Sequence, residues 1–139
     1  MYKRILVAVD GSVNSKRAAK HAAYLASLNP GTVVQVLYIL DYDRTRSDVL
    51  DNAQIADLHK DRQQQLLPID EVFKQRDTHY ELVIKHGEPA PTIVLFANSN
   101  DFDLVIIGSR GLNTFQEMVL GSVSHKVAKQ VTAPVLIIK

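Results

Sequence analysis

The sequence predicts an α/β fold in which helices cover both faces of a mostly parallel sheet. Short apolar runs rich in β-branched residues alternate with stretches of helical periodicity along the whole chain. Three of these runs, residues 5–9, 104–107 and 135–138, lack polar alternation, which is typical of strands buried on both faces. The resulting order is βαβαβαβαβ, and strands joined by helical crossovers pair in parallel.

Two further runs complete a set of five predicted strands. Residues 33–40 form an apolar run interrupted only by Gln35. Residues 80–85 are more mixed in polarity, so we expect this strand to lie near an edge of the sheet.

The first helix is predicted from about Asn14 to Leu28, because alanines recur there at helical spacing. Either Ser12 or Asn14 is suited to cap it. Residues 29–31, Asn-Pro-Gly, end it, since proline cannot continue the helical hydrogen bonds.

Three more helices are expected. Residues 47–76 are helical in pattern but largely polar, and Pro68 should kink this helix or split it in two. Another begins near residues 88–91, where prolines suit a first turn. The side of this helix that faces the core is expected to carry Ile93, Phe96 and Ala97. The last runs from Ser122 to about Val131, with a valine stripe.

The amino-acid composition argues against several classes of function. The 139 residues, 46% of them hydrophobic and 22% charged, suit one globular domain over residues 1–139. The formal net charge of +1, without a block of like charges, argues against nucleic acid or a membrane surface as partner. The absence of cysteine excludes disulfides and thiol chemistry. No signal peptide or membrane-length apolar stretch is evident, so we expect a cytoplasmic protein.

The candidate site lies where two buried strands end. Asp10 follows the first strand directly. After residues 104–107 come Gly108, Ser109, Arg110 and Gly111, then nine residues, then Gly121 and Ser122 at the start of the last helix. Glycines allow close approach of the main chain, and free N–H groups at a helix start bind anionic oxygens, so this pattern predicts a phosphate site. The spacing is neither that of a Walker A loop nor GxGxxG.

Simpler interpretations of these residues remain open. Asp10 and Ser122 are both suited to cap the helices that follow them. Gly108 and Gly111 are also common turn residues at strand ends. The five histidines lack metal-ligand spacing, so no protein ligand for a metal is expected.

Several motifs resemble those of the universal stress protein family, and the resemblance covers the whole chain. They are residues 5–12 (ILVAVDGS), 85–89 (KHGEP), 103–111 (DLVIIGSRG), 121–124 (GSVS) and 133–138 (APVLII). The resemblance implies a Rossmann-like, adenine nucleotide alpha hydrolase-like sheet of five parallel strands in the order 3-2-1-4-5. It also implies ATP lying across the switch between the first and fourth strands.

Carried over by position, the resemblance assigns a role to each motif residue. The adenosine end would meet Ala8, Val9 and Asp10, the last through a hydrogen bond, and adenine would also contact Ile39. Ribose and phosphates would be surrounded by Gly108, Arg110, Gly111, Gly121, Ser122 and Val123. Because all the glycines are retained, the ATP-binding subgroup is favoured, with Mg²⁺ held by the phosphates.

The family resemblance also implies a homodimer through the last strand, Val135 to Ile138, whose apolar edge would otherwise stay unpaired. The function expected is that of a nucleotide-binding sensor in the stress response, read by an unknown signalling partner. Two alternatives are a slow ATPase or other nucleotide-hydrolysing enzyme, and an interaction module preferring AMP or cAMP. The enzyme is disfavoured because Ser12 stands where haloacid-type phosphatases have their second aspartate.

Overall fold

The computed structural model describes residues 2–40, 52–109 and 121–139. Five parallel strands form one sheet in the order β3-β2-β1-β4-β5, as predicted. In chain order the elements are β1 (Arg4–Val9), α1 (Val13–Leu28), β2 (Val33–Leu40), α3 (Asn52–Gln75), β3 (Glu81–His86), α4 (Pro89–Ser99), β4 (Leu104–Gly108), α5 (Ser122–Gln130) and β5 (Val135–Ile138).

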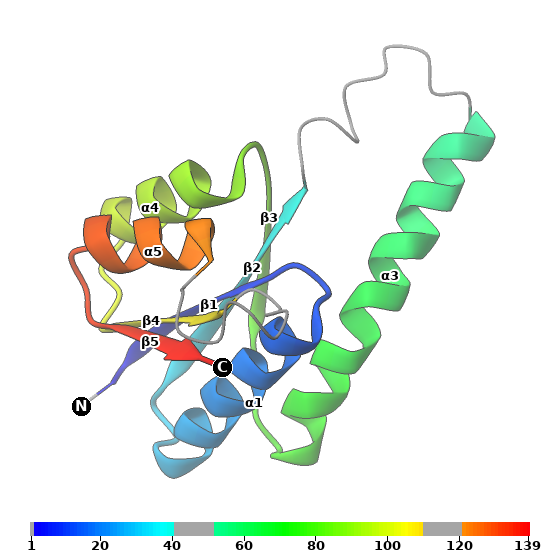
Figure 1. Ribbon diagram of the computed structural model, residues 1–139. Coiled ribbons are helices and arrows are strands. Elements are labelled where there is room, and N and C mark those ends of the chain that lie inside the picture. The colour runs from blue at the N-terminus through cyan, green and yellow to red at the C-terminus, as the bar shows by residue number, and fades with distance from the viewer. Residues whose placement is uncertain (1, 41–51, 110–120) are drawn as a thin grey trace.

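Helices cover both faces of the sheet, α1 and α3 on one and α4 and α5 on the other (Figure 1). Strand alternation divides the core between the two faces. Ile5 and Val7 of β1 pack in the cluster with α1 and α3, whereas Leu6 packs with α4 and α5. The predicted burial on both faces is therefore confirmed for the central strands β1 and β4.

The same expectation is wrong for β5, which is an edge strand. Leu136 remains 36% exposed, and Val135 and Ile137 are only half-buried. An apolar run alone does not distinguish a central strand from an edge strand, because both edge and centre use β-branched residues. β3 forms the opposite edge, as its mixed polarity predicted.

Helix α1 starts and ends as the sequence predicted. The Ser12 hydroxyl oxygen accepts a hydrogen bond from the Ser15 N–H at 3.1 Å and so caps the first turn. The alanines of its inner face are buried against the sheet, which lets the helix lie close to β1 and β4. The helix ends at Leu28, and Asn29 follows in an extended conformation.

Pro68 does not divide α3, so the predicted split is wrong. One helix runs from Asn52 to Gln75 with the proline inside it. The residues just after the proline, Ile69, Val72 and Phe73, are at least 95% buried in the core. Packing on this scale, ~1.5–3 kcal/mol for each large apolar side chain, offsets the roughly 3 kcal/mol that an interior proline costs. Within the described residues, no helix has both the length and the hydrophobicity of a membrane span.

Asp103 ties the start of β4 to the start of β1. Its Oδ2 accepts hydrogen bonds from the main-chain N–H groups of Lys3 at 2.8 Å and Arg4 at 2.9 Å. The Arg4 and Lys3 N–H groups hold the pKa of this carboxyl below its usual 3.8. A carboxylate whose pKa is lowered by folding stabilises the protein above the unfolded pKa, and that stabilisation is lost as pH falls through the folded value.

Asp103→Asn should therefore make the free energy of unfolding less dependent on pH in the acid range. The wild type should lose more stability between about pH 6 and about pH 3 than the variant does, as measured by urea unfolding at each pH. Asp101→Asn is the matched control, because Asp101 meets Arg4 through its main-chain carbonyl and not its side chain. Identical pH profiles for wild type and Asp103→Asn would contradict the assignment.

Candidate functional site

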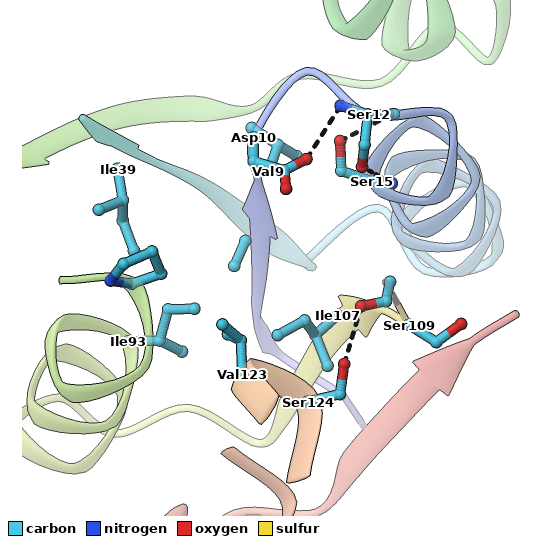
Figure 2. A pocket seen from close by; sticks show the side chains of 13 residues that line it. Val9, Asp10, Ser12, Ser15, Ile39, Ile93, Ile107, Ser109, Val123 and Ser124 are labelled. Carbon is cyan, nitrogen blue, oxygen red and sulfur yellow. Dashed lines mark hydrogen bonds between the residues drawn. The ribbon is translucent and has the colours of Figure 1, made fainter. Parts of the chain in front are cut away.

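A pocket opens at the carboxyl ends of β1, β2 and β4, between the starts of α1, α4 and α5 (Figure 2). Open parallel sheets bind ligands at this position, where the winding direction reverses. Six of the predicted site residues line it: Ala8, Val9, Asp10, Ile39, Gly108 and Val123. Seven others complete the lining: Ser12, Ser15, Pro89, Ile93, Ile107, Ser109 and Ser124.

Asp10 occupies the turn between β1 and α1 at the edge of the pocket. Its Oδ1 accepts a hydrogen bond from the Ser12 N–H at 2.9 Å, and Gly11 between them has φ 86°, which suits glycine. Because Ser12 is the N-cap of α1, the interpretation of Asp10 as the cap is wrong. The Asp10 side chain is exposed, so its second carboxylate oxygen remains accessible from the pocket.

Gly108 is the last residue of β4 and lies against the first turn of α1. A Cβ added there would come within 2.7 Å of the main-chain carbon and oxygen of Asn14. Asn14 also donates a hydrogen bond from its side-chain nitrogen to the carbonyl of Ser109. Gly108 is therefore not simply a turn residue, because the close approach of α1 to β4 leaves no room for a side chain.

Helix α5 begins at the pocket without a side-chain cap. Gly121 is its N-cap, and the first intrahelical hydrogen bond runs from the His125 N–H to the Gly121 carbonyl. Ser122 is exposed in the first turn, so the prediction that it caps the helix is wrong. The N–H groups of residues 122–124 precede that first bond and have no intrahelical acceptor.

The two predicted glycine bends lie together. The Ser124 hydroxyl donates to the Gly108 carbonyl at 3.2 Å, which joins the first turn of α5 to the end of β4 (Figure 2). Gly121 and Ser122 do not line the pocket themselves, although Val123 beside them does. Arg110 and Gly111 lie outside the described residues.

One wall of the pocket is apolar. Ile93 and Ile107 are almost fully buried, and Ile39 and Val123 are half-buried beside them. The sequence predicts Ile93 only as a core residue of its helix; its position one turn after the start of α4 at Pro89 is the signal that it faces the strand ends. Helical periodicity gives the buried side of a helix but does not distinguish packed core from pocket wall.

The polar part of the lining is neutral apart from Asp10. Hydroxyl groups come from Ser12, Ser15, Ser109 and Ser124, and none of the thirteen described lining residues is cationic. The Ser15 and Ser124 hydroxyls donate to main-chain carbonyls, whereas the buried Ser109 oxygen has no hydrogen-bond partner among the described residues. Within the same part of the chain, no group of three or more acidic or histidine side chains is arranged to hold a metal.

A sequence model described as the universal stress protein family matches residues 1–139. The chain belongs to the universal stress protein family. This universal stress protein is 29% identical to the universal stress protein YxiE of Bacillus subtilis, with 100% of each chain covered. It therefore spans the full length of that relative.

Solved structures of family members share the fold. This universal stress protein is 28% identical to MJ0577 of Methanocaldococcus jannaschii, with a TM-score of 0.82 over 100% of this chain and 96% of the other. It is 26% identical to a universal stress protein of Archaeoglobus fulgidus solved in complex with dAMP, with a TM-score of 0.70 over 99% and 98% of the two chains.

Proposed function

We propose that this universal stress protein binds an adenine nucleotide, ATP in the first place, in the pocket at the carboxyl ends of β1, β2 and β4. The observation that carries the proposal is the uncapped first turn of α5, whose N–H groups lie beside a pocket with one apolar wall. The A. fulgidus relative with dAMP supports the adenine nucleotide as the ligand class.

Adenine fits the apolar side of the pocket. A planar ring would lie against Ile39, Ile93 and Ile107, and it would cover the apolar surface that the half-buried Ile39 leaves open to water. Ala8 and Val9 would contact the adenosine end from β1. The accessible carboxylate oxygen of Asp10 would accept a hydrogen bond from a ribose hydroxyl.

The phosphates would lie at the start of α5. Main-chain N–H groups of Ser122 and Val123 are suited to anionic oxygens, and the positive end of the helix dipole adds about 0.3–1 kcal/mol. Gly108, Gly111, Gly121 and Arg110 belong to the same proposal, with Mg²⁺ held by the phosphate oxygens when present. Neutral donors dominate the described lining, so most of the binding energy would come from hydrogen bonds and not from ion pairs.

The role proposed for binding is regulatory: nucleotide occupancy orders the surface around the pocket, and a signalling partner binds that surface.

A slow ATPase is the second candidate function. The described pocket offers Asp10 as its only carboxylate, and its Oδ1 already accepts the Ser12 N–H. Phosphate release that Asp10→Ala abolishes would favour the ATPase, whereas release that the variant leaves unchanged would reveal a contaminating enzyme.

Identification of the nucleotide that copurifies with the protein tests the ligand. Denatured protein should release an adenine nucleotide, identified by ion-exchange chromatography against ATP, AMP and cAMP standards. Recovery of AMP or cAMP in place of ATP would favour the interaction module. Recovery of no adenine nucleotide, together with no binding on titration, would reject the proposal.

Two further properties are part of the proposal. The half-exposed β5 strand, Val135–Ile138, would pair with a second copy to form a homodimer, because burying an apolar edge stabilises association. The location proposed is the cytoplasm.

A further inference from the structure

Strand β3 forms the second edge of the sheet, and its charged and apolar residues are arranged in complementary positions on either side of Val83. Within the described residues, β3 pairs only with β2. Five of its six side chains are exposed, including the large apolar Leu82 at 42% and Ile84 at 38%. Proline, which commonly protects an edge strand, is absent from residues 81–86, and the protecting charges present are Glu81 and Lys85.

We propose that β3 pairs antiparallel with β3 of a second copy of this chain, about a two-fold axis at Val83. In that register Glu81 of one copy lies opposite Lys85 of the other, at both ends of the pair. Leu82 lies opposite Ile84, and Val83 lies opposite its own equivalent. Opposite charges and apolar side chains directly across two strands each stabilise the pairing.

Neighbouring registers lack this complementarity. A shift that places Leu82 opposite itself brings His79 opposite Lys85 and Glu81 opposite Val83. A shift that places Ile84 opposite itself brings Lys85 opposite Val83. Registers displaced by one residue require the second sheet to be turned over, because strand side chains alternate between faces. Only the register centred on Val83 places Glu81 of each copy opposite Lys85 of the other.

The apolar pair would form on the face that α1 and α3 cover. Leu82 and Ile84 are register partners of Val36 and Tyr38, which belong to the core cluster on that face. The Phe73 ring near the end of α3 packs tilted against the Tyr80 ring, with centroids 4.7 Å apart, yet Leu82 and Ile84 stay exposed. A second β3 strand would cover both residues and leave the β5 edge, at the far side of the sheet, free for its own contact.

Single cysteines test the register, because the chain has none of its own. In Val83→Cys the two thiols would lie opposite each other, with Cα atoms about 4.5–5.5 Å apart, within the range that a disulfide spans. In the control His86→Cys, which leaves both charge pairs intact, they would lie about 20 Å apart, six residues along the strand. Treatment with the oxidant diamide should convert Val83→Cys to a covalent dimer of twice 15.5 kDa on a non-reducing gel, and His86→Cys should stay monomeric.

Equal cross-linking of the two variants, or none in Val83→Cys, would overturn the proposal. Charge reversal gives an independent measurement by sedimentation equilibrium in the Leu136→Lys background, which charges the β5 edge. Glu81→Lys or Lys85→Glu alone should weaken self-association roughly tenfold, since each creates two like-charge pairs across the axis. The double variant should restore it, and single variants that associate like their parent would contradict the β3 contact.

Discussion

Gly108→Ala is expected to lower the free energy of unfolding by roughly 1–3 kcal/mol, the usual cost of an added group in a packed interior. The new methyl group would meet the Asn14 main chain at 2.7 Å, which no rotamer change can relieve. The first turn of α1 must therefore move away from β4. Urea unfolding followed by circular dichroism measures the loss.

Gly31→Ala is the matched control for this substitution. Its added Cβ would meet only the Asn29 side-chain oxygen, at an ordinary 3.6 Å, and Gly31 has no positive φ. We expect its stability to stay within about 0.5 kcal/mol of the wild type. Equal unfolding midpoints for Gly108→Ala and Gly31→Ala would show that α1 does not depend on the close approach.

Asp10→Ala should weaken ATP binding by roughly tenfold to a hundredfold, the range for losing a hydrogen bond to a charged group. The substitution removes the proposed acceptor for the ribose hydroxyl. It also removes the acceptor for the Ser12 N–H, so the turn into α1 loses a hydrogen bond of 2.9 Å. Calorimetric titration of both proteins with ATP gives the ratio of affinities.

Asp10→Asn separates these two contributions. The asparagine oxygen can still accept from Ser12 and preserve the turn, but the charge is gone. We expect an intermediate affinity and an unfolding midpoint close to that of the wild type. ATP affinities that are equal in wild type, Asp10→Asn and Asp10→Ala would exclude Asp10 from the site.

Local sequence patterns predicted most of the helices and strands, because interactions between residues close in sequence largely determine these elements. The uninterrupted apolar run at residues 5–9 predicted a strand buried on both faces, and Ser12 at the start of an alanine-rich stretch is one of the two expected caps. Edge position is a property of the whole sheet, so the run at 135–138 did not by itself reveal that β5 has an open side; the strand order implied by the family resemblance did. The continuity of α3 through Pro68 depends on tertiary burial of residues such as Phe73, which no local pattern contains.

The sequence predicts the position of those candidate-site residues that directly follow or end a strand. Asp10 and Gly108 follow strands directly, so the strand positions fix them at the carboxyl edge of the sheet. Ile93 and Pro89 line the pocket from α4, and their contribution depends on how far that helix extends over the sheet. The last helix begins at Ser122 as predicted, but its N-cap is Gly121 and not Ser122, because the cap position precedes the first helical residue.

Calorimetric titration of the wild-type protein with ATP and with adenosine tests most directly whether the α5 amides hold phosphates. We predict one ATP site per chain and a markedly weaker affinity for adenosine, because adenosine fills the apolar wall but leaves the N–H groups of the first α5 turn without an anion. Equal affinities for ATP and adenosine, or no saturable binding of ATP, would contradict it.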